Sequence, residues 1–470
     1  MFKKWLSIFK RKNKISDIMR RLILPFLMFI ALASWGKSNH STIGWKAGTA
    51  RITITPEQSM WMAGYAARTK PAEGKLHDLW AKALFLEDSE ENKSLLITTD
   101  LIGFSKVLSD RICNKLEEKM GLSRAQIILN SSHTHSGPVL TDDSKNYYPL
   151  DADQIKKRDD YSDLLVEKII QISLEAERKL KPVNLFAQNG VVRFQVNRRN
   201  NQESKIEETT ELKGPNDFAV PVLKVENKQG KTEAIVFGYA CHATVLNGYE
   251  WSGDYPGFAQ IELEKKYKGA TAMFFQGAGA DQNPLPRRSI PLAEQYGKEL
   301  ASAVNRVLNE KMTPLTSHLK TAYSETDIRF AHAPPTAKKL HQITEENSGY
   351  PEYLKLNAHF LLEKVKNGKK LIGSYPYPVQ VWKMGEHLLI SLGGELLTGY
   401  AIRLKKIYGN NTFVLGYSND VMAYIPTAEV LAEGGYEGTR SALFTTPWSS
   451  DIEEVIINKV AQLVSKLEKE

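Results

Sequence analysis

The chain is organised around Ala125-Gln126-Ile127-Ile128-Leu129-Asn130-Ser131-Ser132-His133-Thr134-His135-Ser136-Gly137-Pro138. The first half of this stretch is apolar and of strand length, and the second half is polar and closes on a Gly-Pro turn, which predicts a buried strand that ends in a loop. His133 and His135 are two residues apart, so on an extended backbone both imidazoles leave the same face. They could bind one metal ion together, or one could bind metal while the other moves a proton. The alternative is a pair of ordinary surface histidines.

Partners of the right chemical type recur later in the chain. His242 ends the apolar run Phe237–Ala240, and Glu395 follows Gly393-Gly394 at the end of another apolar run. Two neutral imidazoles and a carboxylate are the ligand set of many catalytic zinc sites, which leave one position open for water. Each residue also has a structural explanation, as a core histidine or as an acid at a helix start. Strand ends that are distant in sequence can meet at one edge of a sheet, so we expect these side chains to converge.

Apolar runs of strand length alternate with segments of helical spacing along the whole chain, which predicts a layered α/β fold with a mixed sheet and flanking helices. The expected helices cover residues 104–120, 161–180, 255–267, 291–308, 351–365, 396–407 and 451–467. The expected strands cover residues 45–56, 79–86, 94–99, 125–130, 185–196, 219–225, 234–240, 270–275, 320–330, 380–382, 388–392 and 413–416. A length of 470 residues alone suggests two to three domains. No linker-like break follows residue 45, however, so we expect one large domain over residues 45–470.

The N-terminal segment accounts for most of the positive charge. Residues 1–33 hold eight Lys or Arg against one Asp, so about +1 of the formal +8 remains for the rest, and charge gives no case for nucleic-acid binding. The basic run precedes a short apolar segment that ends in an Ala-x-Ala site at Ala33, which is typical of a secretory signal peptide. The alternative is an uncleaved signal anchor over residues 1–33. Residues 34–44 are expected to form a linker under either interpretation. Cys113 and Cys241 lie in different contexts, so we expect two buried thiols.

A Gly-rich loop follows the apolar run that ends at Phe275. It reads Gly277-Ala278-Gly279-Ala280-Asp281-Gln282-Asn283-Pro284. The third glycine of a dinucleotide-binding fingerprint is missing and no clear helix start follows, which argues against nucleotide binding. We interpret the loop as a tight turn that lines a pocket.

In these residues the chain resembles the neutral/alkaline (non-lysosomal) ceramidase family, from about Trp45 to Tyr436. The string His133-Thr134-His135-Ser136-Gly137-Pro138 is the most specific part of the resemblance. The other matching pieces are Gly48–Thr53, Gly64-Tyr65-Ala66, His77, Asp100, Asn197-Arg198, His242, Asp254, Gly393-Gly394-Glu395, Ser418-Asn419, Tyr424, Tyr436 and Glu437.

The resemblance implies a set of roles. His133, His242, Glu395 and Tyr424 resemble the zinc ligands of that family, whereas His135, Arg198 and Tyr436 resemble the residues beside the scissile amide. The family hydrolyses the amide bond of N-acylsphingosine. Such chemistry is coherent with the side chains: zinc activates water, an imidazole transfers the proton, and Arg and Tyr donate hydrogen bonds to the developing oxyanion.

Three departures from the family pattern bear on the substrate. Gln282 stands nearest the position of a family serine that has been proposed as a nucleophile, and a carboxamide is no nucleophile, so attack by metal-activated water is favoured. Val139-Leu140 replace glycines after Ser-Gly-Pro, which changes the pocket mouth. The immunoglobulin-like C-terminal domain of full-length ceramidases is not expected here. We place Asp254, Asp281 and Gln282 at the substrate pocket.

The sequence therefore predicts an exported, zinc-dependent amidohydrolase that acts on N-acylsphingosine or a related N-acyl lipid. A lipid substrate implies contact with a membrane surface. The alternatives are a zinc hydrolase of a different amide or ester, and a non-catalytic lipid- or ligand-binding relative.

Overall fold

A large mixed sheet forms the centre of the computed structural model, which describes residues 44–142, 146–439 and 446–469. The signal peptide or signal anchor expected over residues 1–33 lies outside these residues. The sheet has the strand order β11-β9-β8-β6-β1-β3-β4-β5, with β13 paired to β6. Its strands are β1 (Lys46–Thr53), β3 (Trp80–Glu87), β4 (Lys93–Thr99), β5 (Ile127–Ser131), β6 (Lys181–Val191), β8 (Ala219–Asn227), β9 (Thr232–Tyr239), β11 (Thr271–Gln276) and β13 (Thr313–Pro314).

A second sheet packs on one face of the first. Its order is β14-β15-β16-β18, with β14 (Leu319–Arg329), β15 (Ser374–Met384), β16 (His387–Leu392) and β18 (Phe413–Leu415). Buried side chains of both sheets, such as Phe275 on β11 and Trp382 on β15, form one apolar cluster between them. Three short two-stranded pairs complete the strands: β2 (Gly74–Lys75) with β10 (Glu250–Trp251), β7 (Gln195–Asn197) with β12 (Gln282–Pro284), and β17 (Glu395–Leu396) with β19 (Tyr424–Ile425).

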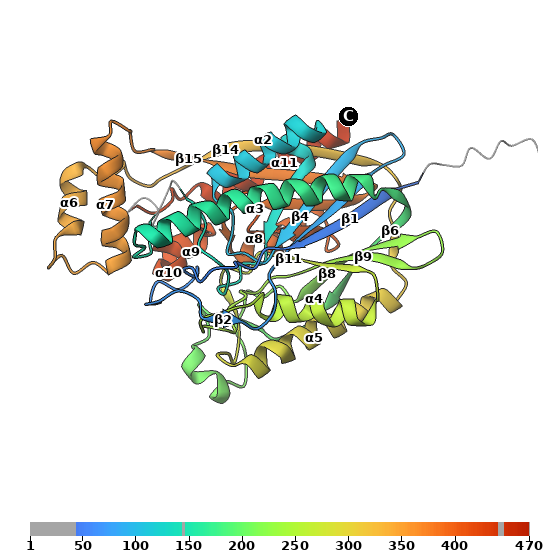
Figure 1. The fold of residues 1–470 in the computed structure, drawn as a ribbon, viewed down its shortest axis with the longest axis horizontal. Helices are drawn as coiled ribbons and strands as arrows, with labels where there is room; N and C mark the ends of the chain where they lie inside the picture. The colour runs from blue at the N-terminus through green and yellow to red at the C-terminus, as the bar shows by residue number, and fades with distance from the viewer. Residues whose placement is uncertain (1–43, 143–145, 440–445, 470) are drawn as a thin grey trace, which may run out of the picture. The chain divides into compact units, whose positions relative to one another are not determined.

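Helices cover the outer faces of both sheets (Figure 1). The described α-helices are α2 (Lys106–Met120), α3 (Ala152–Arg178), α4 (Asp254–Lys266), α5 (Ile290–Asn309), α6 (Ala337–Thr344), α7 (Glu352–Lys366), α8 (Thr398–Tyr408), α9 (Ala428–Glu433), α10 (Gly435–Thr439) and α11 (Ile452–Lys469). α2 and α3 share an apolar cluster with the β1–β5 half of the large sheet, and α4 and α5 share another with β8, β9 and β11. α8 and α11 pack on the second sheet. The expected layered α/β fold is confirmed, with helices outside two stacked sheets.

The local signals in the sequence explain where elements begin and end. α5 begins after Ser289, whose side chain accepts a hydrogen bond from the amide of Leu292, and Pro291 lies in its first turn. α2 ends at Gly121, which adopts φ = 68°, a conformation that glycine adopts without a Cβ penalty. Every residue of β11 is buried, as its continuous apolar run predicts for a strand covered on both faces. None of the helices in the described part of the chain combines the length and hydrophobicity needed to span a bilayer.

The edge strands β5 and β11 of the large sheet meet at their carboxyl ends. The backbone amide of Gln276, the last residue of β11, donates a 2.9 Å hydrogen bond to Oδ1 of Asn130 on β5. The end of β18 and the residues that follow it bridge the two strand ends, since Leu415 pairs with Gly277 directly after β11 and Ser418 pairs with Asn130 on β5. The carboxyl ends of β5, β9 and β11 therefore gather at one place, and the loops that leave them are brought together there.

Candidate metal centre and active site

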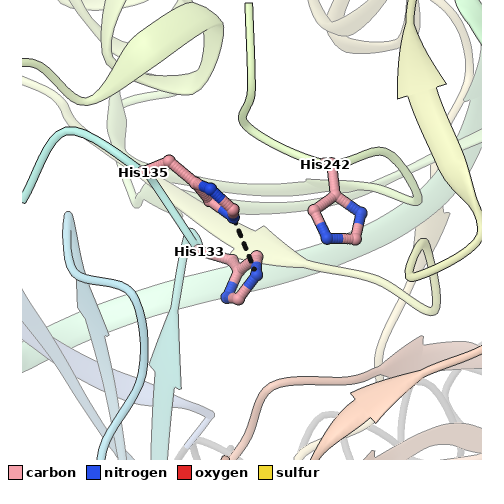
Figure 2. Close-up of side chains that lie close together, drawn as sticks. All are labelled: His133, His135 and His242. Carbon is pink, nitrogen blue, oxygen red and sulfur yellow. Dashed lines mark hydrogen bonds between the residues drawn. The ribbon is translucent and has the colours of Figure 1, made fainter. Parts of the chain in front are cut away.

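His133 and His135 lie on the loop that leaves β5. His133 adopts φ = 59°, a left-handed conformation that is rare for a residue with a Cβ. Its Nδ1 lies 2.6 Å from the carbonyl oxygen of Ile102, and its Nε2 lies 3.2 Å from Nε2 of His135 (Figure 2). His133 is 3% exposed, so the pair is not the surface pair of the alternative interpretation. Strained backbone of this kind is found at functional sites, where surrounding structure holds it in place.

His242 reaches the same point from the loop after β9 (Figure 2). Its backbone amide donates to the carbonyl oxygen of Gln282 at 2.9 Å, and its Nδ1 lies 3.0 Å from the carbonyl oxygen of Gly279. The ring centroids of His133 and His242 are 5.0 Å apart. The loops that follow β5 and β9 thus bring His133 and His242 together in one buried cluster, as the sequence predicts.

Glu395 and Tyr424 enter the site together, because they pair directly in the parallel ladder between β17 and β19. Oε2 of Glu395 lies 3.3 Å from Nε2 of both His133 and His242. The preceding Gly394 has φ = 70°, and a Cβ there would lie 2.4 Å from the side chain of Ile425. Glycine is required at this position so that β17 can approach β19 closely. The carboxylate expected after the two glycines is therefore at the imidazole cluster.

The hydrogen bonds of the cluster define its tautomers. Because carbonyl oxygens only accept, Nδ1 of both His133 and His242 must carry hydrogen, and in the neutral rings each Nε2 presents a lone pair. These two lone pairs face a carboxylate oxygen. Burial and Arg198 lower the pKa of His242 to about 4, and burial together with the neighbouring histidines holds the pKa of His135 well below its usual value. Burial alone would raise the pKa of Glu395, but attraction to His133 and His242 in their protonated form outweighs burial and lowers this pKa well below its ordinary value.

The arrangement fits a bound metal cation. Three electron-rich atoms that converge without donors between them are stabilised by a positive charge at their centre. Ligand atoms roughly 2.0–2.2 Å from a tetrahedral zinc lie about 3.3–3.6 Å apart, which matches the two 3.3 Å separations from Glu395 to the imidazoles. The backbone carbonyls behind each Nδ1 are the usual outer partners of metal-binding histidines. Nitrogen atoms of His133, His135 and His242 also lie within 4.8 Å of one another, so His135 is within reach of the same ion.

Tyr424 and Arg198 form the adjoining part of the site. Nη2 of Arg198 lies 3.3 Å from Oη of Tyr424, and Nε donates to Glu437 at 2.8 Å. Burial raises the pKa of Tyr424 well above its usual value, so its phenol keeps its proton at pH 7 unless a cation stabilises the anion. The rings of Tyr424 and Tyr436 are 5.2 Å apart, and Tyr436 is 47% exposed. Arg198, Tyr424 and Tyr436 are thus brought together beside the imidazole cluster.

Asp281 and Gln282 support the site from behind. Oδ1 of Asp281 accepts hydrogen bonds from the backbone and hydroxyl of Thr398 at 2.9 and 2.7 Å. The side-chain amide of Gln282 donates to the carbonyl oxygen of Ala240, and its own backbone carbonyl accepts a hydrogen bond from the backbone amide of His242. Among the described residues, Asp281 and Gln282 do not line either of the two cavities beside the cluster. The next residue, Asn283, lines one of them. The Gly-rich loop therefore positions His242 more than it forms a pocket wall.

Asp254 also lies apart from the two cavities. Its carboxylate accepts the backbone amides of Leu246 and Tyr255 at 2.8 and 2.7 Å and is fully buried at the start of α4. Burial raises the pKa of this carboxyl to about 6. The geometry gives Asp254 a role in holding the loop after His242, and its assignment to the substrate pocket stays a prediction.

An apolar cavity of about 260 Å³ opens on the cluster. Its walls include Val139 and Leu140, which the sequence places at the pocket mouth, as well as His133, His135 and Glu395. Four aromatic residues that sequence reasoning did not assign also line the cavity: Phe104, Tyr147, Tyr148 and Tyr353. Glu437 and Tyr417 were also missed as site residues; Glu437 holds Arg198, and the ring of Tyr417 lies 4.4 Å from that of His133. Glu437 is one of the pieces that carry the family resemblance, but the resemblance gave it no role, and no feature of the sequence signalled the contact between Tyr417 and His133.

The fold and the site together define an α/β protein with a buried imidazole–carboxylate centre. The family model of neutral/alkaline non-lysosomal ceramidases (N-terminal part) matches residues 45–286, just over half of the chain. The chain belongs to this family.

Individual relatives are distant and longer. The chain is 26% identical to neutral ceramidase B of Dictyostelium discoideum over 245 residues, which are 48% of the chain and 33% of that protein. It is 21% identical to neutral ceramidase 2 of Arabidopsis thaliana over 284 residues, 58% of the chain and 36% of that protein. The matched region thus spans about a third of the length of these curated relatives.

Among solved structures, the neutral ceramidase from Pseudomonas aeruginosa is similar with a TM-score of 0.70 and 19% identity, over 91% of this chain and 75% of that one. A ceramidase complexed with C2 gives a TM-score of 0.70 and 17% identity, over 91% and 76%. At these identities the structural likeness establishes the fold.

Proposed function

We propose that the protein is an exported zinc-dependent amidohydrolase that cleaves the amide bond of N-acylsphingosine or a related N-acyl lipid. The observation that carries the proposal is the position of Oε2 of Glu395, 3.3 Å from Nε2 of both His133 and His242. His133, His242, Glu395 and Tyr424 are the residues that would hold the ion. Bound zinc would supply Lewis acidity and lower the pKa of water towards about 7.

The protein side chains supply the remaining chemistry. His135 is neutral at pH 7 because its pKa is depressed, so its imidazole can accept a proton and return it to the departing amine. Arg198 stays charged, since Tyr424 and Glu437 outweigh the effect of burial and raise its pKa. Together with the phenol of Tyr436, it is a donor suited to an oxyanion that develops on the acyl carbonyl. The apolar cavity beside the cluster suits the acyl chain.

Export is supported by the basic run and the short apolar segment before Ala33. Contact with a membrane surface follows from a lipid substrate. N-terminal sequencing of the mature protein, combined with fractionation of the producing cells, tests the leader: an intact Met1 in the cytosolic fraction would contradict export.

The decisive experiment combines metal analysis with turnover. Purified protein should bind about one zinc per chain and hydrolyse fluorescent N-acylsphingosine. His133→Ala should lose metal and turnover together, whereas His341→Ala, which changes an exposed histidine of α6, should keep both. A well-folded protein that binds no metal and cleaves no N-acyl substrate would favour a non-catalytic binding relative. Zinc binding with hydrolysis of simple esters alone would favour the different-substrate alternative.

A further inference from the structure

A second cavity, of about 620 Å³, opens on the same catalytic centre. It shares His135, Tyr424, Tyr436 and Gly64 with the apolar cavity. A substrate whose amide lies beside His135 therefore has two directions in which its two halves can extend. The acyl half and the amine half of an N-acyl compound are joined at that amide.

The linings of the two cavities differ in chemistry. Most residues that line the apolar cavity are aliphatic or aromatic, such as Ile102, Leu150 and Met422, although Asp142 and Arg158 also line it. Among the described residues, the second cavity has no Leu, Ile, Val, Met or Phe in its lining, which we therefore call the polar groove. Because burial of methylene groups is favourable only against apolar surface, an alkyl chain is stabilised in the first cavity and not in the groove. The apolar cavity, at about 260 Å³, is just below the roughly 300–1,000 Å³ of ordinary ligand sites, a size that suits one chain.

The polar groove carries an excess of positive charge. Four arginines and two glutamates line it. Glu437 pairs with Arg198 and Arg199 at 2.8 Å each, and Glu203 pairs with Arg287 at 2.7 and 2.5 Å. These pairs use the carboxylates of both glutamates.

In the described part of the chain, Arg288 is the one arginine of the groove lining that forms no ion pair with the two glutamates of that lining. Its side chain is exposed, Nη1 donates to Oη of Tyr65 at 3.0 Å, and no ion pair of Arg288 occurs within the described residues. Its guanidinium carbon lies 5.4 Å from the centroid of the Tyr65 ring, and the His135 ring lies 4.7 Å from the same centroid. The backbone of Arg288 is anchored by a 2.7 Å hydrogen bond to Val245. A guanidinium that is hydrogen-bonded to Tyr65, has unused donors and lies one aromatic ring away from the reacting centre is suited to bind an anion.

We propose that the preferred substrate is an N-acyl compound whose amine half bears an anionic group, a carboxylate, sulfonate or phosphate, bound by Arg288 in the polar groove. The inference rests on the proposed amidohydrolase function and selects among its substrates. In the reaction the C–N bond breaks, water supplies hydroxyl to the acyl carbon and a proton to the nitrogen, and a fatty carboxylate and an anionic amine are released. Arg288 binds the substrate and takes no part in proton transfer.

A matched pair of substrates tests this inference. N-dodecanoyltaurine and N-dodecanoylethanolamine share the acyl chain and the two-carbon amine, and differ in a sulfonate against a hydroxyl. The metal-loaded protein should cleave the sulfonate with a kcat/KM at least about tenfold higher, the effect of one good charged hydrogen-bond contact. The ratio should fall as salt rises, because the guanidinium is exposed. Arg288→Gln should bring the ratio close to one mainly through KM, whereas the control Arg306→Gln, on the exposed side of α5, should leave it unchanged.

Equilibrium binding of the two compounds keeps the outcomes separate. Equal binding to the wild type, or a preference that survives Arg288→Gln, overturns the inference, while hydrolysis of N-acylsphingosine leaves the proposed function in place. If none of the amides is cleaved but the sulfonate is still bound about tenfold more tightly through Arg288, the anion site stands and the proposed function is overturned.

Discussion

Gly64 gives the sharpest test of how the active-site loop is built. It adopts φ = 98°, and a Cβ placed on it would lie 2.4 Å from Cγ and 2.6 Å from Nδ1 of His135. The residue therefore packs its backbone directly against the ring that we assign to proton transfer. Gly64→Ala adds a single methyl group where none fits, so either the loop or the imidazole must move.

The magnitude follows from two separable costs. A residue with a Cβ in the left-handed region costs about 1–2 kcal/mol, and overpacking of a tight contact costs about 1–3 kcal/mol more. Gly121 isolates the first cost, since its φ is 68° and a Cβ there would meet nothing within 4 Å. We expect Gly121→Ala to lower the free energy of unfolding by about 1–2 kcal/mol and Gly64→Ala to lower it by about 2–5 kcal/mol.

Urea unfolding of both variants measures the difference, and kcat on an N-acyl substrate shows whether His135 has moved. Gly64→Ala should also reduce kcat, whereas Gly121→Ala should not, because it lies at the end of α2. In a His135→Ala background the collision is partly relieved, so the loss caused by Gly64→Ala should shrink. Equal losses for the two glycine variants, with kcat retained, would refute the packing of this loop on His135.

Three further predictions concern the surroundings of the site. Glu395→Gln removes the carboxylate shared by His133 and His242 and should weaken zinc binding by more than about 100-fold in a chelator competition; retained affinity would place the ion elsewhere. Asp254→Asn removes a carboxyl whose pKa is about 6 in the fold and 3.8 as the ordinary value. Protonation of this group stabilises the fold below pH 3.8, and this contribution is lost as the pH rises through 6. The free energy of unfolding of the variant, measured in urea, should therefore rise by about 2–3 kcal/mol relative to that of the wild type between pH 4 and 7. A difference that stays constant with pH would contradict the raised pKa. Gln282→Ala should cost about 1–3 kcal/mol of stability, because the side chain holds the carbonyl of Ala240, yet keep most of kcat; loss of turnover with zinc retained would point to a direct role.

Most of the predicted helices and strands followed from hydrophobic periodicity, and the predicted site residues followed from their places at strand ends. The helix expected over 104–120 is α2, and the strand expected over 270–275 is β11, each within two residues. β15 is much longer than the expected 380–382, because Pro376 and Pro378 hid its start, and α3 begins nine residues before the expected Tyr161. Both cysteines are buried and free, as expected.

The residue types indicated that His133, His242 and Glu395 could meet, but the sequence did not show how the fold brings them together. The edge strands are joined by a buried hydrogen bond from Gln276 to Asn130, and no local sequence pattern predicts a long-range hydrogen bond of this kind. The pairing of Glu395 with Tyr424 uses strands of two residues each, which are too short for periodicity to reveal. The assignment of Asp281 and Gln282 to the substrate pocket stays a prediction; their hydrogen bonds to Thr398 and Ala240 link distant segments, which local sequence does not reveal.

The segment between β14 and β15 forms the α6–α7 pair (Figure 1). Tyr353 of this segment lines the apolar cavity. The two ends of the segment are clamped side by side, because Arg329 and Ser374 are paired in the ladder of the second sheet. An insertion tethered at one closed point can be exchanged as a cassette without disturbing the strands that carry it. Grafting helical pairs of other lengths at this point offers a route to change the wall of the apolar cavity, and with it the acyl-length selectivity of the proposed reaction, without moving the imidazoles.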